Sequence, residues 1–453
     1  MDKRTFLKTS SALLAGSFLT PFKPVIPRNL QEIRTNWAGN LEYSASNYYQ
    51  PRTLNELQEL VARLDKLRML GTRHCFNTVA DSTENQISLE RIDHFMELDE
   101  EAQTVTISAG VTYGELGPFL DERGYALHNL ASLPHISVVG ACATATHGSG
   151  VNNGNLATAV NGIEFMDAGG ELHHLTREED GDKFNGAVVA LGSLGVVTKL
   201  TLDVEPAYQM RQFVYLQLPV SELEKNFEEI MSAGYSVSLF TDYQSDSVNQ
   251  VWIKQKIEGV AAALPDPGQN FFGATLADRH VHPIIEISAE NCTRQMGIPG
   301  PWYNRLPHFR LEFTPSSGKE LQAEYFVPQD HAVEAYQQIS SMKSDLEPLL
   351  MISEVRTIAE DDLWMSSTSG RPSVAFHFTC QQNWDELKKV LPVIEEKLRP
   401  FDVRPHWGKM FTMSPSRLES VYDRIADFRN LLAEYDPNGK FQNHFVRQNI
   451  IGS

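Results

Sequence analysis

The spacing of apolar and polar residues in the first two hundred positions predicts short helices and strands in alternation. Residues 53–56 (TLNE) have the form of a capping box, and apolar residues at helical spacing follow, so we predict a helix that begins at Leu54. A second helix is predicted over residues 113–123, with Gly124 as its stop. Alternating apolar and polar residues predict strands at 103–109, 161–167, 171–175 and 196–204. Short elements of both kinds in this order are typical of an α+β fold.

The pattern changes near Glu205-Pro206. Residues 208–404 contain more aromatic residues and strand-like runs, such as 213–216 and 323–327, which predict a second domain. The last segment, 405–453, contains a predicted helical stretch over 415–435 that the sequence DPNG then ends.

The first candidate for chemistry is the segment 71–77 (GTRHCFN), which follows the apolar pair Met69-Leu70. Because glycine has no Cβ, a turn that begins with Gly71 lets backbone N–H groups approach an anion closely. The ring of His74 is a nucleophile that could carry a covalent cofactor. Considered alone, however, an ordinary turn is the simpler explanation of this segment.

A second segment, residues 131–150, makes a cofactor site more plausible than an ordinary turn. It is almost uncharged and rich in Gly, Ala, Ser and Thr, whereas a disordered tract would carry more charge. Small residues with hydroxyl groups indicate a backbone packed closely around a bulky ligand, with amides available to phosphates. A tightly packed structural loop is the alternative.

Two later strand-like runs place polar side chains at every second position. Glu354 and Arg356 share one face of a strand, and so do His377 and Thr379, which continue an apolar run. Polar groups that face inward from a strand need partners. For an isolated Glu-x-Arg pair, a structural salt bridge or a solvent-facing surface is the simpler explanation than a functional site.

Together, segments 71–77 and 131–150 resemble the FAD-binding domain of the vanillyl-alcohol oxidase family. Within it, the runs ISEVRTIAEDDLW (352–364), AFHFT (375–379) and RPHWGK (404–409) are similar to alditol oxidases, which are related to sugar-lactone oxidases. The resemblance implies an α+β, two-domain FAD-linked oxidase. Its vanillyl-alcohol oxidase (PCMH-type) FAD-binding domain would span 31–207 and a mixed α/β substrate domain 208–404, with 405–453 folding back onto the FAD domain.

The resemblance also implies roles for individual residues. FAD would be bound covalently through His74 and held by Gly71, Thr72, Arg73, Cys75, Ser132, Ser137, Gly140, Thr144, Ala145, Thr146, His147, Val197 and His406. A polyol would be bound by Ser132, Gln322, Glu354, Arg356 and Thr379, and the catalytic residues would be Arg356, Lys409 and His377. Arg356 and Lys409 would stabilise negative charge. Because an arginine stays protonated, Lys409 or His377 is the easier candidate for the base.

The implied reaction is oxidation of the terminal primary alcohol of a sugar alcohol, such as xylitol or sorbitol, to the aldose. The hydride would pass to flavin N5, and molecular oxygen would reoxidise the flavin to give hydrogen peroxide. Two alternatives stay open. One is an aldonolactone (gulono- or arabinono-1,4-lactone) oxidase or dehydrogenase, and the other is a non-catalytic binding protein on the same scaffold.

Composition narrows the choice of partners. The chain carries 58 acidic and 39 basic residues, a net charge of -19, which argues against nucleic acid and anionic membrane surfaces. The four cysteines are scattered without metal-ligand spacing, so no metal site is expected.

The first thirty residues predict a signal-like leader. Lys3-Arg4 precedes an apolar run over 12–19 that is too short to span a bilayer, so no stable membrane insertion is expected. The pattern resembles a twin-arginine leader and predicts a periplasmic or secreted protein. An uncleaved leader on a cytoplasmic protein is the alternative.

Overall fold

The structure is a computed structural model that describes residues 34–257, 268–313 and 320–452. The predicted leader, 1–30, lies outside the described residues. Residues 35–453 form one compact unit, so the boundaries predicted near residues 207 and 404 stay predictions. Two large sheets nevertheless follow the predicted change of character near Glu205, because one uses strands before it and the other strands after it.

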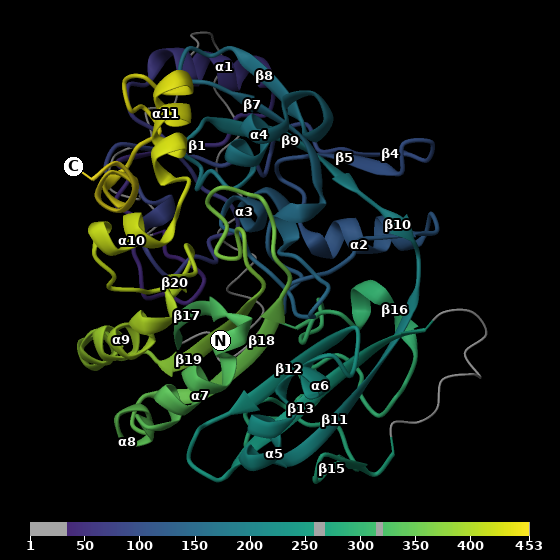
Figure 1. The fold of residues 1–453 in the computed structure, drawn as a ribbon. Coiled ribbons are helices and arrows are strands. Elements are labelled where there is room, and N and C mark those ends of the chain that lie inside the picture. The colour runs from purple at the N-terminus through teal and green to yellow at the C-terminus, as the bar shows by residue number, and fades with distance from the viewer. Residues whose placement is uncertain (1–33, 258–267, 314–319, 453) are drawn as a thin grey trace, which may run out of the picture. The chain divides into compact units, whose positions relative to one another are not determined.

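An antiparallel sheet of five strands is built from the first half of the chain and lies in the upper part of Figure 1. Its order is β4 (Met96–Asp99), β5 (Thr104–Ser108), β9 (Val196–Asp203), β7 (Val160–Met166) and β8 (Leu172–Thr176). Along β9, buried and half-buried residues alternate, as expected for a strand with one covered face. The four strands predicted here are confirmed to within one residue at each end.

A small parallel sheet of three strands precedes it. Its order is β1 (Asn47–Tyr49), β3 (Asn85–Ile87) and β2 (Arg68–Met69), and helix α1 (Leu54–Arg63) connects β1 to β2. The predicted start of α1 is confirmed, because the Glu56 N–H donates to Thr53 Oγ1 at 3.2 Å. Helix α2 (Tyr113–Asp121) also starts where predicted and ends two residues early. The remaining elements of this half are η2 (Thr78–Ala80), β6 (Tyr125–Ala126), α3 (Val138–Ala143), η3 (Leu156–Ala159), α4 (Arg177–Val188) and β10 (Glu205–Pro206).

The second half forms an antiparallel sheet of ten strands, in the lower part of Figure 1. Its order is β14 (Asn270–Phe271), β15 (Ala274–Leu276), β11 (Gln209–Pro219), β13 (Ser247–Ile257), β12 (Ser236–Thr241), β18 (Leu350–Ile358), β19 (Ser373–Gln381), β17 (Glu320–Pro328) and β20 (Arg404–Pro405), with β16 (Gly300–Pro301) beside β11. The helices are α5 (Val220–Lys225), α6 (Phe227–Met231), α7 (Ala332–Ser340), α8 (Lys343–Leu346) and α9 (Trp384–Leu398). Short 3₁₀ turns are η5 (Ala289–Asn291), η6 (Trp302–Asn304), η7 (Gln329–His331) and η8 (Arg399–Phe401).

Helix α9 covers one face of this sheet. Glu395 of α9 accepts a hydrogen bond from the Tyr325 hydroxyl of β17 at 2.8 Å. Because side chains alternate along a strand, the neighbours of Tyr325 on β17 face the other way. That opposite face is free to form a site.

The C-terminal segment packs against the first half of the chain. Lys183 of α4 pairs with Glu434 at 2.7 Å, and the Tyr435 ring lies 5.0 Å from Phe165 of β7. The predicted single helical stretch over 415–435 is wrong, since it is divided into α10 (Pro415–Val421) and α11 (Ile425–Tyr435). Tyr422 adopts an extended conformation between them, and its ring packs 4.9 Å from that of Trp407. The chain then ends in α12 (His444–Val446) and the π-helical turn η9 (Arg447–Ile451).

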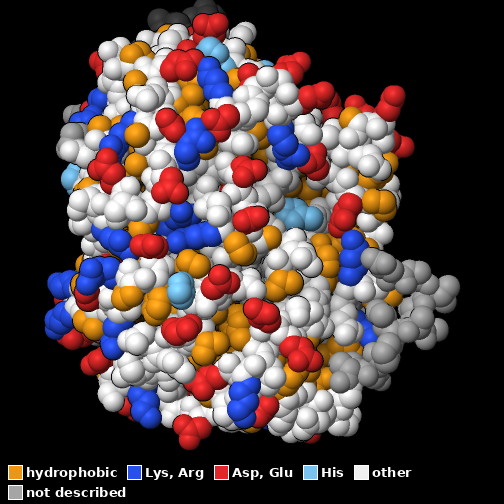
Figure 2. Space-filling view, in the orientation of Figure 1, with side chains coloured by type: hydrophobic (Ala, Val, Ile, Leu, Met, Phe, Trp, Pro, Cys, Tyr) orange, Lys and Arg blue, Asp and Glu red, His pale blue; other side chains and the backbone are white. Residues whose placement is uncertain are grey.

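Acidic and basic side chains are both spread over the face shown in Figure 2. Within the described part of the chain, none of the helices is long and apolar enough to cross a membrane.

Candidate active site

A cavity of about 330 Å³ lies between loops of the first half of the chain and one face of the ten-stranded sheet. The predicted site residues that line it are Gly71, Thr72, Arg73, His74, Cys75, Ser132, Ser137, Gly140, Thr144, Thr146, His147, Val197, Gln322, Glu354, Arg356, His377, Thr379, His406 and Lys409. Ala145 is the exception. It is buried in a left-handed conformation, with a φ of 52°, and its predicted role in binding FAD stays a prediction.

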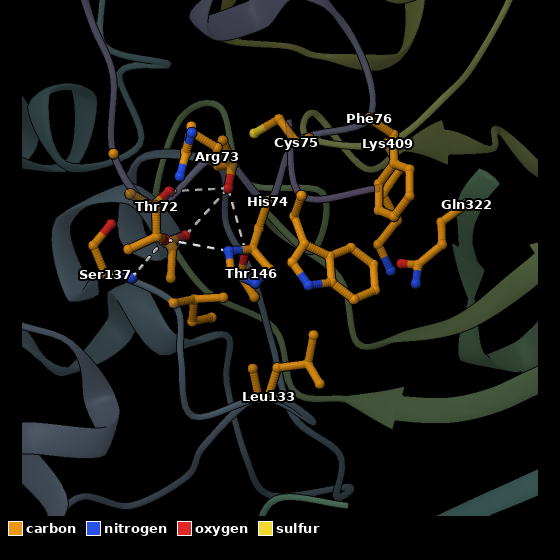
Figure 3. A pocket seen from close by; sticks show the side chains of 18 of the residues that line it. Thr72, Arg73, His74, Cys75, Phe76, Leu133, Ser137, Thr146, Gln322 and Lys409 are labelled. Atoms are coloured by element: carbon orange, nitrogen blue, oxygen red, sulfur yellow. Dashed lines mark hydrogen bonds between the residues drawn. The ribbon is translucent and has the colours of Figure 1, made fainter. Parts of the chain in front are cut away.

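The loop after β2 presents backbone donors to the cavity. Among the described residues, the N–H groups of 71–75 find no hydrogen-bond acceptor, and Arg73 has a φ of 66°. Successive free N–H groups around a left-handed residue form a concave arrangement that suits an anion. A Cβ on Gly71 would lie 2.9 Å from Ser137 Oγ, so glycine allows the loop to approach the start of α3. The Ser137 N–H donates to Thr72 Oγ1 at 3.0 Å and joins the two segments (Figure 3).

His74 points from this loop toward the middle of the cavity (Figure 3). Its Nδ1 lies 3.3 Å from Thr72 Oγ1, and its ring stacks on Trp37 at 5.6 Å. Nε2 is buried without a hydrogen-bond partner among the described residues. Burial lowers the pKa of His74 to about 4, so the ring is neutral and has a free lone pair at neutral pH. Burial raises the pKa of the neighbouring Cys75 thiol to about 11, which leaves it protonated.

The opposite wall is the free face of three neighbouring strands. Each carries polar side chains two residues apart, and these are Gln322 and Glu324 on β17, Glu354 and Arg356 on β18, and His377 and Thr379 on β19. The strand register places His377 opposite both Glu324 and Glu354. The two pairs predicted from the sequence therefore meet on one surface, as strand geometry requires.

Glu324 is the centre of this surface and was not predicted. Its Oε1 lies 2.5 Å from Arg356 Nη2 and its Oε2 2.7 Å from Lys409 Nζ. Burial alone would raise the pKa of Glu324, but Lys409 and Arg356 hold it well below its usual value. The available signal was its spacing, because Glu324 follows Gln322 by two residues within an apolar strand.

Lys409 and His377 differ in charge. Lys409 is ion-paired with Glu324, and although burial lowers its pKa, that carboxylate opposes the shift. Burial lowers the pKa of His377 to about 3, and its Nε2 is buried without a partner among the described residues. Lys409 is therefore a donor, whereas His377 is neutral and able to accept a hydrogen bond. Met410 N donates to Gln322 O at 2.8 Å, which places Lys409 beside β17 (Figure 3).

Glu354 has a second partner that sequence reasoning also missed. His308 Nε2 lies 2.7 Å from Glu354 Oε1, and Lys254 Nζ lies 3.1 Å from His308 Nδ1. Burial raises the pKa of Glu354, but Arg356 and His308 outweigh this and keep it well below its usual value. Neither Lys254 nor His308 lies in a motif, so nothing local in the sequence indicated them.

His147, Glu324 and His406 form a cluster whose ligand atoms lie within 4.8 Å of one another. These are residue types that bind transition metals. Arg356 and Lys409 already neutralise the carboxylate, however, and their charge would oppose a further cation. We therefore assign no metal to the cluster.

The cavity fits a nucleotide cofactor at one end and a small hydroxylated substrate at the other. Free amides and glycine-led loops suit phosphates, and the polar face of β17, β18 and β19 suits hydroxyl groups. Residues 45–176 match the FAD binding domain family. A solvent-stable cholesterol oxidase shares the fold, with a TM-score of 0.73, 14% identity, and coverage of 91% of this chain and 96% of that one. A cholesterol oxidase from B. sterolicum also gives a TM-score of 0.73, at 14% identity over 96% of this chain and 100% of that one. The chain thus contains an FAD-binding domain and has the predicted α+β fold of the vanillyl-alcohol oxidase type.

Two further relatives and a second domain match narrow the class. Alditol oxidase from a Streptomyces strain is 45% identical over 422 residues, covering 92% of this chain and 99% of the relative. L-gulono-1,4-lactone dehydrogenase from Mycobacterium tuberculosis is 26% identical over 446 residues, covering 93% of this chain and 100% of the relative. Residues 316–449 match the D-arabinono-1,4-lactone oxidase family. The chain belongs to the alditol oxidase family and is an FAD-dependent oxidoreductase, as the sequence predicted.

Proposed function

We propose that this protein oxidises the terminal primary alcohol of a sugar alcohol, such as xylitol or sorbitol, to the aldose. Molecular oxygen would be the final acceptor, giving hydrogen peroxide. The observation that carries the proposal is the register of β17, β18 and β19, which sets carboxylates, a guanidinium, an imidazole and a hydroxyl on one wall of the FAD cavity. Each hydroxyl of a polyol is both donor and acceptor, and this set offers partners for both. The relation to alditol oxidase supports the same substrate class.

The residues of the cavity wall have different roles in the proposed reaction. Bound FAD supplies the hydride acceptor. Arg356 and Lys409 lower the cost of negative charge on the substrate oxygen as its proton leaves. Neutral His377 would accept a hydrogen bond from the reacting hydroxyl and receive its proton, while Glu354 and Thr379 would bind hydroxyls further along the polyol.

A covalent bond between FAD and His74 is part of the proposal. The free Nε2 and the low pKa of His74 support it, because a neutral imidazole is a nucleophile. The backbone of 71–75, with Ser137 and Gly140, would receive the phosphates.

A lactone substrate is the second candidate, because residues 316–449 match the D-arabinono-1,4-lactone oxidase family. Purified enzyme should be supplied in air with xylitol, sorbitol and L-gulono-1,4-lactone in parallel, while hydrogen peroxide and the organic product are quantified. Equimolar peroxide and aldose from a sugar alcohol supports the proposal. Turnover of the lactone alone would replace it with the second candidate.

Export remains a proposal that rests on the leader sequence alone. A full-length fusion to a reporter that is active only outside the cytoplasm should be exported, and Arg4→Lys combined with Lys3→Gln should block it. Equal reporter activity from both would show that the segment is not an export signal.

A further inference from the structure

Lys254 and His308 form a buried chain of hydrogen bonds that leads to Glu354. Lys254 Nζ lies 3.1 Å from His308 Nδ1, and His308 Nε2 lies 2.7 Å from Glu354 Oε1. Lys254 of β13 is 1% exposed and His308 is 5% exposed. A lysine is rarely buried to this degree unless its amino group is paired or hydrogen-bonded.

The direction of each hydrogen bond in the chain is fixed. Glu354 is ionised and can only accept, so His308 Nε2 must carry the proton. His308 Nδ1 then holds a lone pair, because burial lowers the pKa of His308 to about 4 and keeps it neutral. Lys254 donates to that lone pair, and it also donates to the Leu306 carbonyl oxygen. Lys254 therefore reinforces the tautomer of His308 that donates to Glu354 and holds the ring in place.

The chain of hydrogen bonds from Lys254 occupies one carboxylate oxygen of Glu354 and leaves the other oxygen without a partner among the described residues. Oε1 is 2.7 Å from His308 Nε2 and 3.6 Å from Arg356 Nε. Oε2 has no hydrogen-bond partner among the described residues, and Glu354 lines the cavity. The hydrogen bond from His308 to Oε1 restricts rotation of the carboxylate and so limits the directions in which Oε2 can face.

We propose that Lys254 and His308 are positioning residues that aim Glu354 Oε2 at one hydroxyl of the polyol, away from the reacting carbon. The inference rests on the proposed function and adds a specificity element to it. His308 lines the cavity, Lys254 is not among the described residues that line it, and both act through Glu354, so their loss should affect substrate recognition more than the chemical step.

The test uses variants in the full-length, FAD-loaded enzyme. His308→Phe removes the donor but keeps a ring, His308→Gln keeps an amide donor, and Lys254→Met keeps the stem without donors. Lys256→Met is the matched control, since Lys256 lies two residues away on the same strand and pairs with Glu205 at 3.2 Å. FAD content and thermal midpoint are measured for every variant to confirm folding.

We expect His308→Phe and Lys254→Met to raise KM for the sugar alcohol by about tenfold to a hundredfold, as for loss of a hydrogen bond to a charged group. The value of kcat should change much less, and His308→Gln should recover part of the loss. A series of deoxy-alditols should contain one analogue, lacking the hydroxyl that Glu354 accepts, for which the variants and wild type have equal KM. A purely structural defect would penalise every analogue alike.

Two results would overturn the inference. One is an unchanged KM in both Lys254→Met and His308→Phe, and the other is an equal penalty across all deoxy analogues. If His308→Phe fails to fold, ¹⁵N NMR of histidine-labelled wild-type protein decides: His308 should be the Nε2–H tautomer, and an Nδ1–H tautomer would overturn the inference. Wild-type FAD that no sugar alcohol reduces would instead refute the proposed function, so the two failures are distinguishable.

Discussion

Glu324→Gln is the perturbation that most directly tests the charge network on the cavity wall. Glu324 is fully buried and accepts from Arg356 at 2.5 Å and from Lys409 at 2.7 Å. The glutamine keeps the shape but removes the negative charge, which takes away the partner of Lys409 and leaves Arg356 with Glu354 at 3.6 Å. Removing one partner of a buried ion pair costs about 3–5 kcal/mol, so the free energy of unfolding should fall by that order.

Urea unfolding of the FAD-loaded variants, followed by tryptophan fluorescence and circular dichroism, measures this change. Glu434→Gln is the control, because its pair with Lys183 lies on the surface, where such pairs contribute about 0–1 kcal/mol. Without Glu324, the pKa of Lys409 should fall further, so the alkaline limb of the kcat/KM profile should move to lower pH. A loss no larger than that of Glu434→Gln, with an unshifted alkaline limb, would refute the reasoning.

The remaining predictions concern the cofactor, the chemistry and acid stability. His74→Ala should release all FAD on acid precipitation, whereas FAD that stays with the precipitate would place the covalent bond elsewhere. Lys409→Met should slow anaerobic reduction of FAD by about tenfold or more while FAD content is unchanged, because it loses a charge that stabilises the substrate oxygen; unchanged reduction kinetics would remove Lys409 from the mechanism. Gly71→Ala should lower FAD content, since its Cβ would lie 2.9 Å from Ser137 Oγ; normal loading in Gly71→Ala would contradict this. His377 and His308 have pKa values lowered to about 3 and 4, so the unfolded chain binds protons first as the pH falls below about 6.5. Stability should therefore be full above that pH and decline below it, by up to about 1.4 kcal/mol per pH unit for each histidine, and His377→Asn should have a shallower decline in urea titrations from pH 7 to 4.

The pattern along the chain predicted the first half of the fold well, for a physical reason. Strand 196–203 has one covered face, so burial imposes an alternation that is visible in the sequence. The capping interaction of Thr53 with Glu56 is local and was visible too. The break at Tyr422 was not, because the contacts that hold it extended come from Trp407 and Pro405, which lie outside the helical stretch.

The site shows the same division between local and distant causes. Glu354, Arg356, His377 and Thr379 could be predicted because spacing on a strand fixes which side chains share a face. Glu324 obeys the same spacing and could have been found with Gln322. His308 and Lys254 could not be predicted, because both are far from Glu354 in the sequence and approach it only in the tertiary fold.

The central claim is that a sugar alcohol reduces the FAD of this protein. Purified protein should be mixed anaerobically with xylitol, sorbitol and an aldonolactone in parallel while the flavin absorbance is recorded. The account predicts bleaching by a sugar alcohol and return of the colour when air is admitted. Bleaching by the lactone alone, or by none of the three, would contradict it.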